Sequence, residues 1–180
     1  MASSAKRATN RLLLGCGLAL SACSSRLPSP ADPPPGVSTV ALGTPVEFVF
    51  DSLDNRPVTA QGALGKPTII VFVTTSNLPA QAQVDFLVAM ANHDKGRNNF
   101  ILVALEPRDN RELVEIYRKA LSVPFPVAMA DDATLSGRSA FGDLSGVPVT
   151  VMLDRAGRLV WRVEGRVVKS SELRDAMRGL

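Results

Sequence analysis

From about residue 43 onward, the pattern of hydrophobic and polar positions changes repeatedly between strand and helix periodicity. Runs typical of strands either alternate or are wholly apolar and rich in β-branched residues, and we expect them at 46–50, 58–60, 68–75, 100–105, 124–130, 149–153 and 159–163. Runs typical of helices are expected at 79–93, from near 109 to 120, at 131–141 and at 170–178. Strands that alternate with helices and finish in a hairpin predict an α/β fold with a mixed central sheet and helices on both faces.

Some of these elements carry more specific signals. The first two strands enclose a turn-rich segment at 51–57, which predicts an opening β-hairpin, and 68–75 has the continuous apolar character of a central strand. Helical stripes are formed by two sets of residues: Val84, Leu87, Val88 and Ala91, and then Leu113, Ile116, Tyr117 and Ala120. Asp109 and Glu112 have the spacing of a capping box for the second of these helices, and Asp131 and Asp132 mark the start of the third.

The first 42 residues have a different character. A basic start is followed by an apolar run at 12–20, which is typical of a secretory signal and too short to span a bilayer. The segment 20–23 (LSAC) resembles the lipobox of bacterial lipoproteins, which implies cleavage after Ala22 and acylation of Cys23; an ordinary signal with a chance cysteine is the alternative. Five prolines within 24–36 predict a semi-rigid spacer, or else a proline-rich ligand for a partner.

These features divide the chain into a signal peptide (1–22), a lipidated cysteine with its tether (23–42) and one globular domain (43–180). The lipoprotein reading implies a protein anchored to membrane lipid in the cell envelope and facing the periplasm. An aspartate directly after the lipidated cysteine would resemble an inner-membrane retention signal. This chain has Ser24 at that position, which favours the outer membrane.

Charge excludes one class of function. The sequence has 20 basic and 17 acidic side chains, and three of the basic ones precede residue 23 with no acid among them, so the remainder carries 17 of each. Basic residues are also interleaved with acids, and aromatic residues are few. We therefore expect no nucleic-acid partner.

Two segments carry a family resemblance. Residues 65–75 (GKPTIIVFVTT), with the helix after them, are similar to the strand and first helix of membrane-tethered thiol-disulfide reductases and redoxins of the thioredoxin superfamily. Residues 146–160 (GVPVTVMLDRAGRLV) are similar to the cis-proline strand and hairpin of that family, including its alkyl hydroperoxide reductase and thiol-specific antioxidant branch. The resemblance covers residues 44–180 and implies a thioredoxin-like fold with thiol-disulfide oxidoreductase activity.

The chain departs from this family at the catalytic motif. The two positions that match the Cys-x-x-Cys are Asn77 and Ala80, and Val71 stands where the family has a buried acid. Disulfide exchange needs a thiolate, which neither an amide nor a methyl group can supply. Cys16 would leave with the signal and Cys23 would be acylated. We therefore expect no catalytic residue, and the chain is more consistent with a non-enzyme.

The degenerate site retains groups that could bind a ligand. Thr75, Ser76 and Asn77 form a polar cluster at a helix start, where backbone N–H groups favour an anion or a carbonyl; the alternative is that they only cap the helix. The resemblance implies a cis peptide at Pro148, which would leave the backbone of Val147 free to pair with an extended segment. His93 is the single histidine, so we expect neither a metal site nor a cofactor.

Three functions remain open. The chain could be a redox-inactive module that binds an envelope protein or peptide at residues 76–80 and Pro148. It could instead be a redoxin that acts through the thiols of a partner or through glutathione. The third possibility is a structural envelope lipoprotein.

Overall fold

The computed structural model describes residue 43, residues 45–178 and residue 180. The expected signal peptide, the lipobox with Cys23, and the proline-rich tether lie outside the described residues, so these predictions stay untested. Within the described part of the chain, every helix is too short or too polar to cross a membrane.

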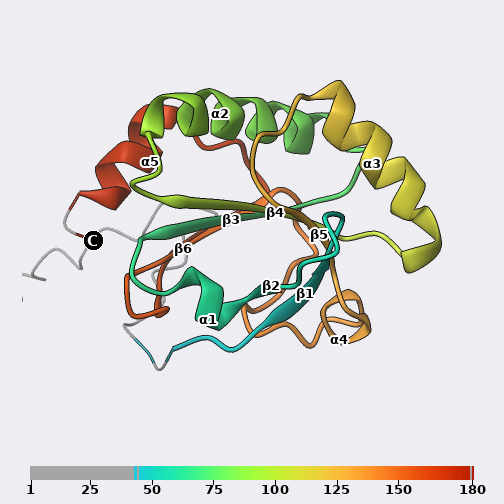
Figure 1. The fold of residues 1–180 in the computed structure, drawn as a ribbon, viewed down its shortest axis with the longest axis horizontal. Helices are drawn as coiled ribbons and strands as arrows, with labels where there is room; N and C mark the ends of the chain where they lie inside the picture. The colour runs from blue at the N-terminus through green and yellow to red at the C-terminus, as the bar shows by residue number, and fades with distance from the viewer. Residues whose placement is uncertain (1–42, 44, 179) are drawn as a thin grey trace, which may run out of the picture. The chain divides into compact units, whose positions relative to one another are not determined.

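Seven strands form one mixed sheet in the order β2-β1-β5-β4-β3-β6-β7 (Figure 1). The central strand β3 pairs in parallel with β4 and antiparallel with β6, β5 is parallel to β4, and the other pairs are antiparallel. The strands are β1 (Val49–Ser52), β2 (Val58–Thr59), β3 (Thr68–Val73), β4 (Asn99–Ala104), β5 (Val127–Met129), β6 (Val149–Leu153) and β7 (Leu159–Glu164). The expected mixed sheet and opening hairpin are both confirmed.

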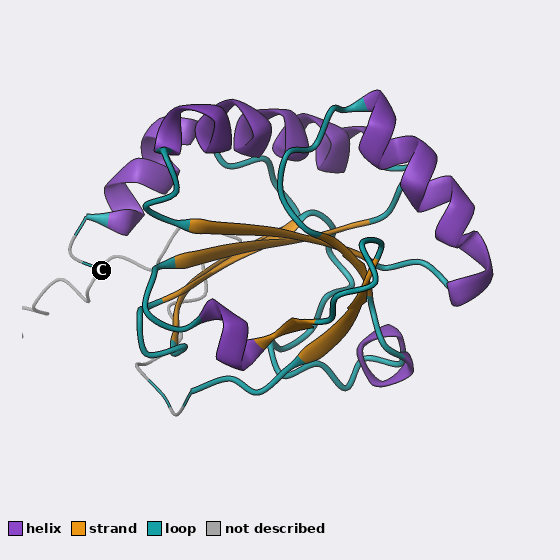
Figure 2. Ribbon diagram, in the orientation of Figure 1, coloured by secondary structure: helices purple, strands orange, loops and turns teal. Residues whose placement is uncertain are grey.

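Helices cover both faces of this sheet, as Figure 2 shows. Three longer helices lie on one face: α2 (Leu78–Asp94), α3 (Arg111–Ala120) and α5 (Ser170–Met177). Two helices of four residues each, α1 (Ala60–Ala63) and α4 (Asp132–Leu135), lie on the other, and a short 3-10 turn, η1 (Arg108–Asn110), precedes α3.

The central strand divides the hydrophobic core in two. All six residues of β3 are buried, and because successive side chains point to opposite faces, Val71 packs into the core beneath α2, whereas Phe72 packs into the opposite core. Phe141, from the segment between α4 and β6, completes that second core, with its ring centroid 5.1 Å from that of Phe72. The sheet is therefore buried on both faces, as the apolar run at 68–75 predicts.

Several predicted elements differ from the structure at their ends; for example, the strands expected at 68–75 and 124–130 are limited to β3 (Thr68–Val73) and β5 (Val127–Met129). The first strand begins at Val49 rather than residue 46, and Ala60 begins helix α1 instead of ending a strand. The helix expected at 131–141 is limited to α4, because Asp131 caps its start and Gly137 has a φ of 79°, which ends the helical conformation. The chain beyond α4 is then free to place Phe141 in the core.

The prediction for α3 was wrong in its cap and only partly right in its buried face. Asp109 lies in η1, and α3 begins only at Arg111 without a side-chain cap from Asn110. Tyr117 is buried as predicted, together with Val114. Leu113 and Ile116, expected to be buried, are instead 46% and 59% exposed, and Ala120 is also exposed.

Candidate functional site

The candidate site lies at the end of the sheet where β3 runs into α2. Parallel pairing sets Val73 beside Ala104, so β4 ends at the same edge, and the N–H of Leu105 donates to the carbonyl of Val73 at 2.7 Å. On the other side of β3, Val149 lies opposite Phe72, which brings Pro148 to this edge. Sheet pairing thus brings together three chain segments that are far apart in the sequence.

Asn77 is the N-cap of α2. Its side-chain Oδ1 accepts a hydrogen bond from the backbone N–H of Ala80 at 2.8 Å, and its backbone is extended. This is the geometry in which a side chain satisfies a helix N–H that has no partner within the helix. The Oδ1 of Asn77 is therefore used by the helix itself. This is the alternative in which the residue only caps the helix.

Glu106 is a site residue that sequence reasoning missed. One oxygen of its carboxylate accepts from both the backbone N–H of Thr75, at 2.8 Å, and the Thr75 hydroxyl, at 2.7 Å. The other oxygen accepts from the side-chain amide of Asn110 at 3.0 Å. The available signal was its position just after a buried strand parallel to β3, since neighbouring parallel strands end at one edge.

These hydrogen bonds hold Glu106 in its charged form. Partial burial acts to raise the pKa of the carboxyl, but the bonds from the Thr75 N–H, the Thr75 hydroxyl and the Asn110 amide outweigh burial and lower the pKa below its ordinary value of 4.5. The segment between β3 and α2 is consequently tied to the segment after β4 by an ionised side chain.

The peptide bond between Val147 and Pro148 is cis. Pro148 is buried and its carbonyl accepts a hydrogen bond from the N–H of Gly165 at 3.0 Å. Val147 is half-buried, and among the described residues neither its N–H nor its carbonyl has a hydrogen-bond partner. A backbone donor and acceptor are thus left for another extended chain.

The loop before Pro148 is held in place by two charged residues of β7. Glu164 accepts a hydrogen bond from the N–H of Gly146 at 3.0 Å and forms an ion pair with Arg162 at 2.8 Å. Arg162 is 7% exposed, and its guanidinium also donates to the carbonyls of Phe141 and Asp143. A buried cation satisfied in this way fixes the loop, because moving the loop would leave the charge without partners.

The start of α2 combines exposed side chains with a buried one. Ser76 is exposed, and Leu78, directly after the cap, is 77% exposed despite being apolar. Ala80 is completely buried in the core beneath α2. Of the two positions that match the Cys-x-x-Cys motif, therefore, Asn77 is partly accessible and Ala80 is not.

The described residues supply little for covalent or metal chemistry here. Both cysteines of the sequence precede residue 43, and Val71 is buried in β3 opposite Thr150, whose buried hydroxyl has no partner among the described residues. Across residues 45–178, no three His, Asp or Glu side chains cluster as metal ligands would, and His93 Nδ1 is bonded to the carbonyl of Ala89. The arrangement can present hydrogen-bonding groups and an apolar side chain to a ligand.

Glu106 should contribute to stability in a pH-dependent way. Its pKa is lower in the folded chain than in the unfolded chain, so the ionised side chain stabilises the fold above the unfolded value, and this contribution is lost as the pH falls through the folded value. We expect Glu106→Gln to lower the free energy of unfolding by about 1 kcal/mol at pH 7. This is a small contribution for hydrogen bonds to a charged group, because solvent screens the partly exposed carboxylate. The deficit should shrink as the pH falls below 4.5.

Urea denaturation across this pH range measures the effect. Glu47→Gln is the matched control, because Glu47 is exposed and has no hydrogen bond within the described part of the chain. If the loss of unfolding free energy in Glu106→Gln does not change with pH, the stabilising role of the ionised Glu106 side chain is wrong.

Gly146 should not tolerate a side chain. A Cβ at this position would lie 2.7 Å from both Cγ and Oε1 of Glu164, and Arg162 restrains that side chain from moving away. We expect Gly146→Ala to destabilise the protein by about 2 kcal/mol, as overpacking does elsewhere. Thermal or urea unfolding measures this, with Gly62→Ala as a control that should cost little, because its Cβ would lie 3.4 Å from the nearest atom. Equal stability of the two variants would show that the loop is free to move.

Comparison with known proteins gives a match in structure but not in sequence. No family model and no curated protein sequence matches this chain. A DsbF homologue from Corynebacterium diphtheriae is similar to it with a TM-score of 0.69 at 15% identity, over 84% of this chain and 96% of that one. A thiol:disulfide interchange protein of the thioredoxin family from Chlorobium tepidum is similar with a TM-score of 0.64 at 20% identity, over 78% and 97%.

A thio-disulfide isomerase from Thermus thermophilus has a higher sequence identity of 28%, with a TM-score of 0.62 over 77% of this chain and 96% of that one. Because these proteins are matched over nearly their whole length, the likeness extends to the complete fold rather than to one βαβ unit. The chain has a thioredoxin-like fold.

Proposed function

We propose that this protein is a lipid-anchored module of the cell envelope that binds an extended protein segment without thiol chemistry of its own. The observation that carries the proposal is the free backbone of Val147, which lies at the sheet edge that also ends in Thr75 and Asn77. A segment laid along Val147 would gain backbone hydrogen bonds of the kind that one strand makes with another.

Leu78 adds an apolar contact to this edge. A leucine that is 77% exposed at the start of a helix gains nothing from the fold, but it would lose its contact with water beneath a bound chain. Burying such a side chain contributes about 2 kcal/mol. Backbone hydrogen bonds are indifferent to sequence, so Leu78 would favour segments that carry an apolar residue.

The absence of thiol chemistry is supported by the sequence. No cysteine follows residue 23, and the polar groups at the start of α2 are already used: Asn77 caps the helix and Glu106 holds Thr75. A carboxylate that accepts three hydrogen bonds and has a lowered pKa is a weak base, which also argues against a role in general acid-base catalysis.

The envelope location and the lipid anchor are proposed from the apolar run at 12–20 and the segment ending in Cys23. A protein with the same fold, a disulfide oxidoreductase from Mycobacterium tuberculosis, is described as secreted. Export of this chain is consistent with that likeness, and the expectation of an outer-membrane rather than an inner-membrane anchor rests on Ser24 alone.

A thiol-disulfide oxidoreductase that uses the thiols of a partner, or glutathione, is the second candidate. It is favoured by the solved structures of similar fold, several of which are described as disulfide oxidoreductases or isomerases. Glutathione binding, measured by calorimetry and weakened by Asn77→Ala, would favour this alternative over the proposal. A purely structural lipoprotein is the third, and absence of any peptide binding would favour it.

The full-length chain should not catalyse reduction of insulin disulfides by dithiothreitol above the uncatalysed rate. The physical reason is that residues 43–180 hold no thiolate to attack a disulfide. The turbidity of precipitating insulin chains is the measurement, with a thioredoxin as positive control. Turnover that persists in a Cys16→Ser/Cys23→Ser variant would reject the proposal in favour of an unrecognised nucleophile, and turnover lost in that variant would reject it in favour of an N-terminal thiol.

Leu78→Glu should weaken the binding of an unfolded polypeptide by about tenfold, since it replaces an apolar contact with a charge. Carboxymethylated α-lactalbumin, which has no free thiol, is a suitable probe, and fluorescence anisotropy is the measurement. The substitution should not impair folding, because an acid at the start of a helix interacts favourably with the helix dipole.

Ile116→Glu is the matched control, because Ile116 is 59% exposed on α3 and lies outside the proposed site. Equal weakening by both substitutions would point to nonspecific hydrophobic contact. If neither the wild-type chain nor the control variant binds the probe, the proposed function is wrong.

A further inference from the structure

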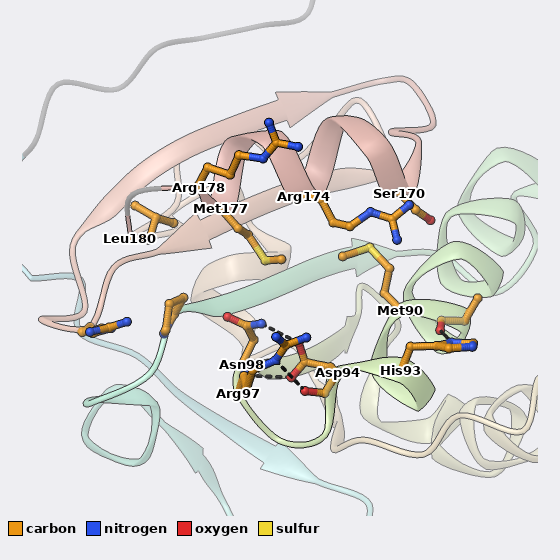
Figure 3. A pocket seen from close by; sticks show the side chains of 13 residues that line it. Met90, His93, Asp94, Arg97, Asn98, Ser170, Arg174, Met177, Arg178 and Leu180 are labelled. Carbon is orange, nitrogen blue, oxygen red and sulfur yellow. Dashed lines mark hydrogen bonds between the residues drawn. The ribbon is translucent and has the colours of Figure 1, made fainter.

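A hollow lies at the other end of the central strand from the candidate site. It has a volume of about 560 Å³ and is lined by Pro67 just before β3, by the last turns of α2, by the turn between β6 and β7 and by α5. Figure 3 shows the side chains from α2 and α5 around it. Its volume is in the range typical of sites for small organic ligands, and it shares no residue with the candidate site.

Positive charge is concentrated around this hollow. Four arginines line it (Arg97, Arg155, Arg174 and Arg178), together with a single acidic side chain, Asp94. The described part of the chain is balanced as a whole: four of the 20 basic residues and one of the 17 acids precede residue 43, which leaves 16 of each. The side chains of the lining carry a formal excess of three positive charges, of which Arg178 is offset by Asp175 just outside the lining.

The one acidic side chain of the lining, Asp94, forms no ion pair with these arginines. Asp94 is buried, and its two carboxylate oxygens accept from the backbone N–H of Asn98 at 2.8 Å and from the Asn98 side-chain amide at 2.5 Å. Arg97 donates to the backbone carbonyl of Asp94, not to its carboxylate. The carboxylate therefore serves to close the turn after α2.

Two of the arginines have guanidinium groups with no protein partner. Within the described residues, the side chains of Arg155 and Arg174 form neither an ion pair nor a hydrogen bond. Elsewhere, four arginines are paired with carboxylates (Arg111, Arg118, Arg162 and Arg166), and Arg178 pairs with Asp175. Four arginines outside the lining also have no side-chain partner among the described residues: Arg56, Arg108, Arg138 and Arg158. Arg155 and Arg174 are thus available for an anion, whose oxygens guanidinium groups bind well.

The inner surface of the hollow is apolar. Met90 from α2 and Met177 from α5 point toward one another across it in Figure 3, and both pack on the core beneath α2. Unbranched thioether side chains adapt to ligands of irregular shape. Arginines at the rim can bind an anionic head, and the methionines within can contact an alkyl tail. The hollow therefore suits a molecule that has both.

We propose that this hollow binds an amphiphile in which a phosphate or carboxylate group is joined to an alkyl chain. Arg174 on α5 binds the anionic group, Arg155 in the β6–β7 turn adds positive charge to the rim, and Met90 and Met177 contact the alkyl chain. The same chemistry is found in the headgroup of an anionic membrane lipid and in a soluble alkyl phosphate or fatty acid, so the source is decided by which probe binds. The proposal is independent of the function proposed for the candidate site.

The test is calorimetric titration of the full chain with monomeric probes. Dodecyl phosphate and dodecanoate, below their micelle concentrations, represent soluble amphiphiles, and dihexanoylphosphatidylglycerol represents a membrane lipid. Inorganic phosphate and dodecyl maltoside are the controls that lack the tail or the charge. We expect at least one anionic amphiphile to bind about tenfold more tightly than either control, with an affinity that falls as salt screens the arginines.

Paired variants make the test specific. Arg155→Gln/Arg174→Gln should weaken binding of the amphiphile by about tenfold. Arg108→Gln/Arg138→Gln, which removes two exposed arginines outside the lining, removes the same total charge and should not weaken it. Met177→Gln should weaken the alkyl probes and leave the response to inorganic phosphate unchanged.

The outcomes separate clearly. Preference for dihexanoylphosphatidylglycerol identifies a lipid headgroup as the ligand, and preference for dodecyl phosphate or dodecanoate identifies a soluble amphiphile; either result supports the site. The proposal is overturned if no anionic amphiphile binds, if inorganic phosphate binds as tightly, or if the two double variants weaken binding equally.

Discussion

The constraint on which this molecule depends is the position of β3 between a parallel neighbour and an antiparallel one, with both of its faces buried. Every residue from Thr68 to Val73 is inaccessible to water, so the strand separates two cores and can present polar groups only beyond its ends. Both sites lie at those two ends. The candidate site follows Val73, and the arginine-lined hollow begins at Pro67.

At the first of these ends, most polar groups serve to hold the site rather than to react. Asn77 closes the start of α2, Glu106 ties Thr75 to the segment after β4, and the buried pair of Arg162 and Glu164 fixes the loop before Pro148. What this framework leaves free is the backbone of Val147 and the exposed side chain of Leu78. A rigid edge with a free donor, a free acceptor and an apolar contact is suited to docking a chain, because little ordering is needed when the ligand arrives.

At the other end, the turn after α2 and the turn between β6 and β7 come together with α5. Here the structural work is done by Asp94, which is held by Asn98, while the guanidinium groups of Arg155 and Arg174 have no described partner. Because the two ends share the strand but no residue, ligands at one end need not disturb the other. The fold thus has room for two separate binding sites.

Much of the fold is determined locally and could be predicted from the sequence. The continuous apolar run at 68–75 predicts a central strand, observed as β3 at Thr68–Val73, and the repeat of strand and helix predicts a mixed sheet covered on both faces, because side-chain periodicity directly reflects burial. The residues of the candidate site at Thr75, Asn77 and Pro148 could be found from the resemblance of two segments to a known family. Boundaries and buried faces were less predictable: α3 starts two residues later than Asp109, and it packs on the core through Val114 and Tyr117 rather than through Leu113 and Ile116.

Other features depend on sequence-distant contacts that only the tertiary structure supplies. Glu106 acts on a residue 31 positions away because parallel strands end at one edge, and Arg162 and Glu164 reach the loop before Pro148 because β7 lies beside β6. Arg97, Arg155 and Arg174 are interleaved with acids along the chain and become a basic cluster only when α2, α5 and the β6–β7 turn meet. The sequence alone determined the elements and the absence of cysteine beyond residue 23; which side chains face one another was decided by strand register and helix packing, which bring distant residues within hydrogen-bond range.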